Sequence, residues 1–176
     1  MKTLVVYTSQ TGFTKRYAGW IAEKAKADLF DLKDVQGKDA SFFEAYDALV
    51  YAGWCMAGKL VKVNWFLDKA PHLTGKKLVV VAVGASPNEN PDVAVFMQNI
   101  LPDEHRQYVK AFYCQGGIDY DKMKLPSKLA MKLFAGSLKK SKDEKMREMG
   151  SLIDHSYDIS DIRYTEPLLS FLSQES

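Results

Sequence analysis

The sequence has few cysteines, no long apolar run and little net charge, and each shortage excludes a class of protein. Two cysteines, Cys55 and Cys114, are too few for the disulfide framework of a small secreted domain. The longest apolar run, residues 78–85 with one glycine inside it, is far shorter than the about 20 residues that cross a bilayer. The 24 basic residues exceed the 22 acidic ones by only two, so the chain lacks the basic bias typical of nucleic-acid binding. We therefore expect no membrane-spanning helix and no nucleic-acid partner.

The amino terminus also lacks a feature, because residues 1–7 lead directly into a strand pattern without the apolar region or cleavage site of a signal peptide. Together with the small number of cysteines, this predicts a protein of the reducing cytoplasm.

What is present is the pattern of a single α/β domain. A length of 176 residues predicts one domain at the usual about 150 residues per domain. Over the first 118 residues, short apolar runs alternate with amphipathic stretches, which is typical of βα units and a parallel sheet. Three of these runs are rich in β-branched residues and indicate strands buried on both faces. Five strands are predicted, over residues 4–7, 29–32, 48–51, 78–83 and 108–113.

Helical spacing of apolar residues predicts helices between and after these strands. One covers residues 17–25 and a second covers residues 60–67. A third begins at Asn90 as N-cap, with a proline at the first helical position. Thr165 is expected to cap the last helix, which has Pro167 in its first turn.

Residues 119–150 interrupt this rhythm, because they lie between the fifth strand and the last helix without resembling a strand connection. Nine basic and four acidic residues give residues 121–150 a net charge of +5, whereas fifteen basic and eighteen acidic residues elsewhere give −3. One predicted helix carries five apolar residues on a single face with lysines around them, namely Leu129, Ala130, Leu133, Phe134 and Leu138. We therefore predict one domain over residues 1–176 with a basic helical insertion at about 119–150.

Several roles remain open for this insertion. It can form a lid or a docking surface for an anionic substrate, an acidic redox partner or an anionic membrane. Alternatively, its apolar side packs on the rest of the domain and its lysines are simply solvated.

The most specific local signal is the segment of residues 9–14, which follows the first predicted strand and opens a helix. The hydroxyls of Ser9, Thr11 and Thr14 can donate hydrogen bonds, and a helix start offers unpaired N–H groups and a positive dipole end. Gly12 allows a close approach of the backbone. These features predict a phosphate site, with an ordinary capped helix as the alternative.

Other phosphate-binding families lack their signatures here. Neither the Gly-Lys-Ser/Thr of a P-loop nor the Gly-x-Gly-x-x-Gly of a dinucleotide-binding turn is present. A cysteine-dependent phosphatase would need an arginine six residues after its cysteine, where Val61 and Tyr120 stand. A response regulator would need acidic residues where Tyr7 and Gly53 end their strands. The three histidines have no metal-ligand spacing, so no metal site is predicted.

Residues 5–14 resemble the FMN-phosphate signature of the flavodoxin family. They match its aliphatic-aliphatic-aromatic-x-Ser/Thr-x-x-Gly-x-Thr pattern at every position. The resemblance implies a flavodoxin-like three-layer sandwich with a five-stranded parallel sheet of order 2-1-3-4-5. It also implies FMN at the carboxyl edge of the sheet, against the loops after strands one, three and four. The implied FMN-binding residues are Ser9, Gln10, Thr11, Gly12, Phe13 and Thr14 in the first loop, Gly53, Trp54, Cys55, Met56 and Ala57 in the second, and Gly84, Ala85, Ser86 and Asn88 in the third.

The second and third of these loops are expected to lie near the flavin ring. Trp54 is expected to stack on the isoalloxazine, with simple packing as the alternative, whereas Cys55 has no Cys-x-x-Cys partner and is expected to act as a small apolar residue. The loop of residues 84–90 contains no aromatic residue. Flavodoxins that act only as electron carriers often have a tyrosine there and are strongly acidic, so this slightly basic chain departs from that type. A flavin face left uncovered would admit a substrate.

Residues 53–60 and the basic insertion together resemble the quinone-dependent protoporphyrinogen oxidase group. That resemblance implies an FMN-dependent oxidoreductase that oxidises a planar, carboxylate-bearing tetrapyrrole and passes electrons to a membrane quinone. The lysines of the insertion would then meet substrate carboxylates or lipid headgroups at the inner face of the membrane. No catalytic acid or base follows from the sequence.

Two alternatives stay open. The chain can be a flavodoxin-type electron-transfer protein that serves a redox partner protein and has no substrate of its own. It can also be an interaction protein that keeps the fold without the cofactor.

Overall fold

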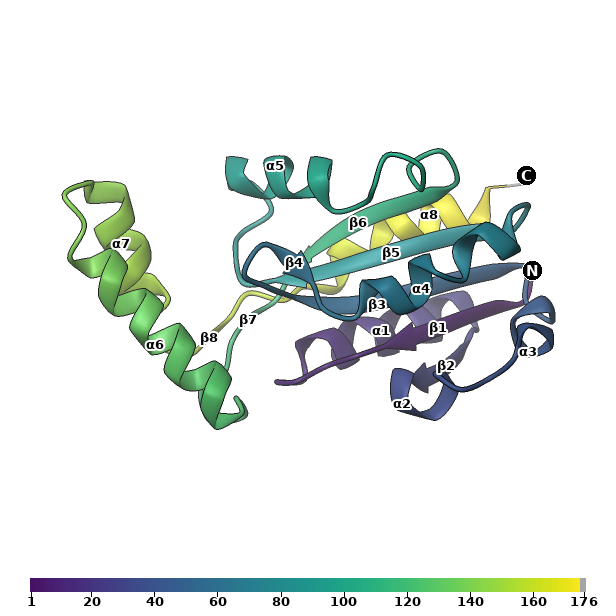
Figure 1. Cartoon of the computed structure of the whole chain (residues 1–176), viewed down its shortest axis with the longest axis horizontal. Helices are drawn as coiled ribbons and strands as arrows, with labels where there is room; N and C mark the ends of the chain where they lie inside the picture. The colour runs from purple at the N-terminus through teal and green to yellow at the C-terminus, as the bar shows by residue number, and fades with distance from the viewer. Residues whose placement is uncertain (175–176) are drawn as a thin grey trace.

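The computed structural model describes residues 1–174, and a parallel sheet forms its centre (Figure 1). Its five parallel strands are ordered β2-β1-β3-β5-β6, and the short β4 pairs antiparallel with the end of β3. Counted without β4, this is the 2-1-3-4-5 order, so the predicted fold class is confirmed. The strands are β1 (Thr3–Tyr7), β2 (Asp28–Asp31), β3 (Ala48–Met56), β4 (Lys59–Leu60), β5 (Lys77–Gly84) and β6 (Val109–Gln115).

The three central strands are buried on both faces, as their β-branched composition predicts. Val5, Val50 and Val79 stand in register across β1, β3 and β5, and each is at most 1 % exposed. Apolar side chains alternate between two cores, one on each face of the sheet. Burial of these side chains, at about 25 cal/mol per Å² of apolar surface, is the main force that holds the sheet together.

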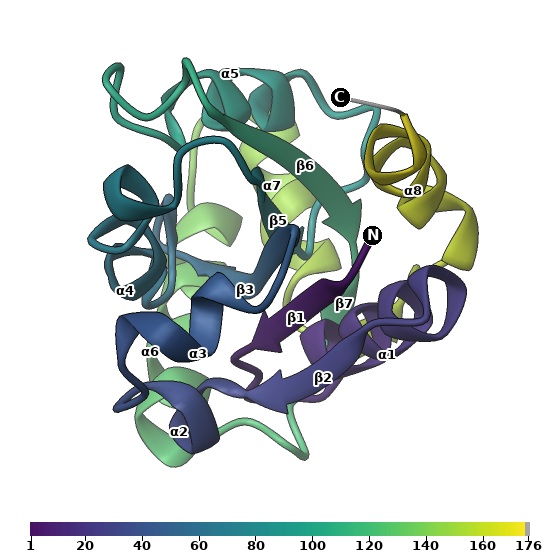
Figure 2. The same ribbon diagram turned by 90° about the vertical axis from the view of Figure 1, so that its right-hand side faces the viewer.

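Helices cover both faces of the sheet, and the view in Figure 2 separates them. One face is covered by α1 (Phe13–Ala25) and α8 (Glu166–Ser173), with the short η2 (Ile162–Thr165) before α8. The opposite face is covered by α2 (Leu32–Val35), α3 (Ala40–Glu44), α4 (Val63–Leu67), η1 (Ala70–Leu73) and α5 (Pro91–Asn99). Of the helices in the described part of the chain, none combines the length and apolarity needed to span a bilayer.

One of the two predicted helix caps is confirmed and the other is wrong, and the second predicted helix begins later than expected. Asn90 caps α5, because its Oδ1 accepts a hydrogen bond of 2.9 Å from the N–H of Asp92. The expected cap at Thr165 is wrong, since its hydroxyl donates back to the carbonyl of Ile162 and α8 has no side-chain cap. Leu60 does not belong to the second helix either. It pairs with Cys55 in the β3–β4 hairpin, where its apolar side chain enters the core of the sheet.

The segment between β6 and α8 leaves the sheet and projects beyond it, far from both chain termini (Figure 1). Two short antiparallel strands, β7 and β8, form its base, and two helices form its body. Its own small core contains Tyr120, Ala135 and Ile153. We call residues 117–158 the helical hairpin; its elements are β7 (Gly117–Ile118), α6 (Leu125–Lys139), α7 (Glu144–Leu152) and β8 (Tyr157–Asp158).

Candidate functional site

The loop between β1 and α1 has the features of an anion site. Gly12 adopts φ 102°, in the left-handed region, and its N–H donates to the hydroxyl oxygen of Ser9 at 3.1 Å. Helix α1 starts at Phe13 with no side-chain cap and no acidic residue in its first turn. Its first N–H groups and the positive end of its dipole therefore remain available to a negatively charged group.

Thr14 supplies the decisive detail of this loop. Its side chain is 1 % exposed, yet its hydroxyl has no hydrogen-bond partner among the described residues. A buried hydroxyl without a partner costs about 1–3 kcal/mol; Thr3 is a second such group, but of the two only Thr14 lies at the start of a helix and beside a crevice. The nearby guanidinium of Arg16 is paired with Asp158 at 2.6 Å, and Lys15 lines a neighbouring pocket together with Ser9 and Gly12. A phosphate monoester fits this set of donors.

A mainly apolar crevice of about 380 Å³ opens beside this loop at the carboxyl edge of the sheet. Four segments form its walls: the loop of residues 9–14, which we call the phosphate loop, the β3–β4 hairpin, the end of β5 and the α6 region. Ten of the fifteen predicted cofactor residues line it, namely Gln10, Thr11, Phe13, Thr14, Trp54, Cys55, Met56, Ala57, Gly84 and Ala85.

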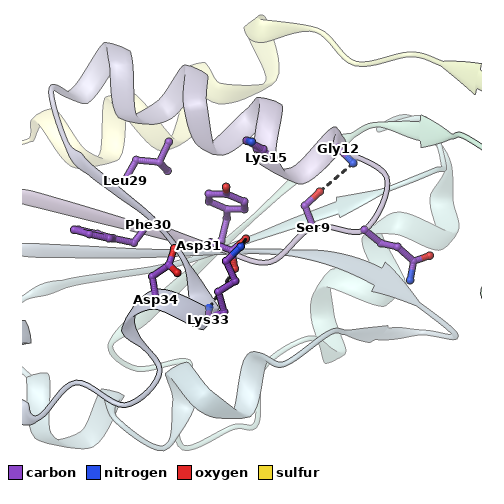
Figure 3. Close-up of a pocket in the computed structure, with 10 residues that line it drawn as sticks. Ser9, Gly12, Lys15, Leu29, Phe30, Asp31, Lys33 and Asp34 are labelled. Atoms are coloured by element: carbon purple, nitrogen blue, oxygen red, sulfur yellow. Dashed lines mark hydrogen bonds and ion pairs between the residues drawn. The ribbon is translucent and has the colours of Figure 1, made fainter. Parts of the chain in front are cut away.

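The other five predicted residues lie outside this crevice. Ser9 and Gly12 line a neighbouring pocket of about 390 Å³ between the phosphate loop and α2 (Figure 3). Gly53 faces β4, where a Cβ atom would lie 2.8 Å from the Leu60 side chain. The carbonyl of Ser86 accepts from the Tyr113 hydroxyl at 2.8 Å, while Asn88 exchanges two hydrogen bonds with Gln115.

The segment after β3 is a β-hairpin rather than an open loop. Strand β3 continues to Met56, and Ala57 and Gly58 form a two-residue turn with φ of 48° and 72°. Positive φ at both positions is the geometry of the tight turns that join antiparallel strands. The hairpin presents Trp54, half-buried, and Met56, 50 % exposed, at the crevice. The strand pairing thus holds this wall in a fixed position.

The α6 region forms a further wall; residues 119–150 were expected to form a lid or a docking surface, but none of them was predicted to line the site. It contributes Met123, Ser127, Ala130, Met131 and Phe134, and the nearby Gly117 and Ile118 complete the lining. The helical periodicity placed Ala130 and Phe134 on one face, but no local signal connected that face with the sheet edge. Phe134 is the aromatic side chain that this wall presents to the crevice.

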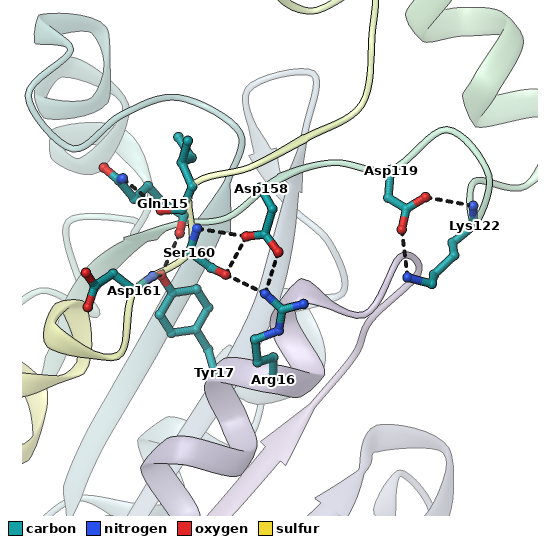
Figure 4. A network of polar contacts seen from close by, with 9 residues as sticks. Arg16, Tyr17, Gln115, Asp119, Lys122, Asp158, Ser160 and Asp161 are labelled. Carbon is teal, nitrogen blue, oxygen red and sulfur yellow. Dashed lines mark hydrogen bonds and ion pairs between the residues drawn. The ribbon is translucent and has the colours of Figure 1, made fainter.

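Polar contacts hold the helical hairpin (residues 117–158) in place beside the crevice. The side-chain amide of Gln10 donates to the hydroxyl of Ser127 at 3.2 Å, and the hydroxyl of Tyr157 donates to the carbonyl of Ala85 at 3.0 Å. At the base of the hairpin, Arg16 donates to both Asp158 and Ser160 at 2.6 Å (Figure 4).

A central hydroxyl extends this network, because Tyr17 donates to the carbonyl of Gln115 at 2.6 Å and accepts from the N–H of Asp161 at 3.0 Å (Figure 4). Burial is the main cause that raises the pKa of Tyr17 well above its usual range, so the hydroxyl stays protonated and the two bonds persist. Helix α1 therefore ties the phosphate loop to the returning strand of the hairpin.

A model of the flavodoxin domain family matches residues 4–145, which is most of the chain. The chain belongs to the flavodoxin domain family. FMN is accordingly the cofactor of this flavodoxin-domain protein, and the unpaired hydroxyl of Thr14 together with the uncapped start of α1 fits its phosphate. As a flavoprotein of this family it acts as an oxidoreductase or an electron carrier.

Solved structures with a similar fold include three flavodoxin-type proteins. Flavodoxin 2 from Bacillus cereus is 21 % identical with TM-score 0.43, covering 64 % of this chain and 84 % of its own. A WrbA-like protein from Agrobacterium tumefaciens is 20 % identical with TM-score 0.46, covering 87 % and 95 %. A Fusobacterium nucleatum flavodoxin bound to flavin mononucleotide is 19 % identical with TM-score 0.36, covering 48 % and 53 %. No curated protein matches this flavodoxin-domain sequence.

Within the flavodoxin-domain crevice, Cys55 is the one lining residue with a titratable thiol. Burial raises its pKa to about 12, so the thiol stays protonated at neutral pH. Cys114 is also buried, and its thiol donates to the carbonyl of Tyr164 at 3.4 Å. The two cysteines thus behave as packing residues and not as a redox pair.

Proposed function

We propose that this chain is an FMN-dependent oxidoreductase with a substrate of its own, which enters the crevice beneath α6. The observation that carries this proposal is the apolar wall of α6, where Ala130, Met131 and Phe134 face the sheet edge. A pure electron carrier needs only an exposed cofactor edge. A substrate that exchanges hydride or electrons directly needs an enclosed surface to lie against.

In this proposal the chain holds FMN by residues of the described site. Ser9, Thr14 and the first N–H groups of α1 bind the phosphate, and Trp54 and Met56 lie against one side of the ring. When bound, FMN supplies a reversible acceptor of one or two electrons. The apolar side chains exclude water and orient a flat substrate.

The lining also limits the chemistry that side chains can perform. No carboxylate, histidine or lysine lines the crevice within residues 1–174, and Cys55 keeps its proton. The chain thus acts by binding and orientation rather than by acid–base catalysis from a charged side chain. This suits a substrate that is easily oxidised once it lies in contact with a flavin.

A more specific form of this proposal names the substrate and the electron acceptor. A planar apolar body with peripheral carboxylates, as in a protoporphyrinogen, matches an apolar crevice beside a segment with a net charge of +5. A quinone is the proposed acceptor, which would place the working protein at the inner face of the membrane.

A substitution in the α6 wall tests the proposal. The FMN-loaded chain is mixed without oxygen with protoporphyrinogen and a water-soluble quinone, and the rate is compared with that of Phe134→Ala. We expect Phe134→Ala to raise KM at least fivefold while the Kd for FMN changes less than threefold. Val95→Ala, which removes an equally exposed apolar side chain from α5, serves as the matched control. Absence of turnover in the unsubstituted chain with any quinone would rule out the named substrate.

The second candidate is an electron carrier, favoured by the exposed tip of the β3–β4 hairpin. Met56 is 50 % exposed there and reaches the crevice, so a partner protein can approach one edge of the cofactor. Fast reduction of the FMN-loaded chain by a flavodoxin reductase, unchanged in Phe134→Ala and slowed in Met56→Asp, would favour this candidate.

A further inference from the structure

The outer face of α6 is an exposed apolar stripe. Leu125, Leu129 and Leu133 follow one another at intervals of four residues, so they lie in one line along the helix, and they are 82 %, 61 % and 66 % exposed. Of the predicted apolar face, Ala130 and Phe134 therefore line the crevice and Leu138 packs in the small core of the helical hairpin, whereas Leu129 and Leu133 stay exposed. Exposed leucines cost little singly, but a continuous row of them marks a contact surface.

This stripe is distinct from the wall of the crevice, although the same helix carries both. Ala130 and Phe134 turn toward the sheet edge, while the leucine row faces away from it. Each leucine is more than half exposed, so no other element within residues 1–174 covers the row, which belongs to the helical hairpin that projects beyond the sandwich in Figure 1. At 1.5 Å per residue, the 15 residues of α6 give a surface about 22 Å long.

Free lysines border the leucine row. Within residues 1–174, Lys124, Lys128 and Lys140 form no ion pair, whereas Lys132 and Lys139 are both paired with Asp154. Lys128 lies one turn after Lys124 along the helix, and Lys140 closes its carboxyl end. The row therefore combines leucines in the middle with unpaired positive charge at its edge and ends.

We propose that the outer face of α6 docks on an anionic lipid surface. Its leucines enter the boundary between headgroups and acyl chains, and its free lysines meet the headgroup charges. A second copy of the chain is disfavoured as occupant, because two segments of net charge +5 repel each other. An acidic protein is disfavoured because the row offers neither an aromatic nor an arginine anchor, nor a pocket for one.

Docking in this orientation has a consequence for the crevice. Because Ala130 and Phe134 lie on the other side of the same helix from the leucine row, docking would leave the crevice one helix diameter, about 10–12 Å, from the bilayer surface. A lipid-soluble electron acceptor would then have only this short distance to cover between the bilayer and the crevice. The access of an electron acceptor to the crevice rests on the proposed oxidoreductase function, whereas the lipid docking itself requires no cofactor.

Co-sedimentation of the full chain with vesicles tests the docking surface. Vesicles of phosphatidylcholine alone are compared with vesicles that also contain phosphatidylglycerol, and binding is expected only to the second kind. The double variant Leu129→Gln and Leu133→Gln should weaken this binding at least tenfold. The double variant Lys128→Gln and Lys140→Gln should weaken it about fivefold per lysine and reduce its salt dependence. Val95→Gln, on α5, is the control that should bind as the unsubstituted chain does.

Three outcomes would overturn the proposal. The first is equal binding to both kinds of vesicle, or none to either. The second is a dimer that the leucine substitutions dissociate, which would assign the row to a second copy. The third is binding to polyglutamate that depends on the lysines but not on the leucines, which would assign it to an acidic protein. FMN affinity, measured in parallel, should be the same in all variants, so a failure of lipid docking is distinguished from a failure of the cofactor site.

Discussion

Gln10 and Ser127 are separated by 117 positions in the sequence and joined by a hydrogen bond of 3.2 Å from the Gln10 amide to the Ser127 hydroxyl. Gln10 belongs to the loop that is predicted to bind the phosphate, and Ser127 lies in the first turn of α6. This bond therefore connects the cofactor-binding loop with the helix that faces it across the crevice. The position of α6, on which both proposals depend, is set partly by this contact.

Removing this bond should loosen α6 without unfolding the sheet. Gln10→Ala is expected to cost at most about 1 kcal/mol, since the bond is partly exposed. Hydrogen exchange should become faster in residues 125–139 and stay unchanged in β5. Gln98→Ala on α5 provides the matched control, and equal exchange in both variants would show that Gln10 does not hold α6.

Thr14 and Thr3 make a matched pair, because both are buried and both hydroxyls lack a partner within residues 1–174. Thr14→Val should weaken FMN binding by about 1–3 kcal/mol and leave riboflavin binding unchanged, since riboflavin has no phosphate. Thr3→Val should leave both affinities as they are. Neither variant should be less stable without ligand, because no hydrogen bond is lost. Equal FMN affinity of Thr14→Val and the unsubstituted chain would show that the phosphate binds elsewhere.

The ion pairs of Asp154 predict an acid-dependent change in the hairpin. Hydrogen bonds from Lys139 and then Lys132 lower the pKa of Asp154 from 3.8 to about 2. Because the pKa is lower in the folded state, the stabilisation is present above pH 3.8 and is lost as pH falls toward about 2. Carboxyl NMR shifts should show Asp154 titrating near the lower value, and Asp154→Asn should remove this part of the pH dependence of unfolding.

Gly117 and Gly136 predict opposite effects of an added methyl group. A Cβ atom on Gly117 would overlap the carbonyl oxygen of Tyr157, at the point where β7 pairs with β8. Gly117→Ala should therefore destabilise the base of the hairpin by more than 1 kcal/mol. Gly136 lies within α6 with open space around it, so Gly136→Ala should stabilise the helix by about 0.5–1 kcal/mol. Thermal unfolding of the two variants measures both effects, and a neutral Gly117→Ala would contradict the packing of the two strands.

The sequence predicted well those features that depend on neighbours along the chain. Strand burial follows from runs such as residues 78–83, since β-branched side chains with no polar alternation must be covered on both faces. The phosphate loop is also a local prediction, because all its proposed donors lie within residues 9–14, and its contact with the phosphate stays a prediction. The cap at Asn90 is likewise local, because its partner stands two residues away.

Only the tertiary structure decided which distant segments share the crevice. Leucines and lysines at helical spacing predicted an amphipathic helix around residues 128–140, but the spacing was the same whether that helix covered the sheet or stood apart from it. The pairing of β7 with β8 and the contact of Gln10 with Ser127 direct one side of α6 to the crevice and leave the other exposed. Periodicity along a helix records which residues share a face, whereas contacts between remote segments determine what that face meets.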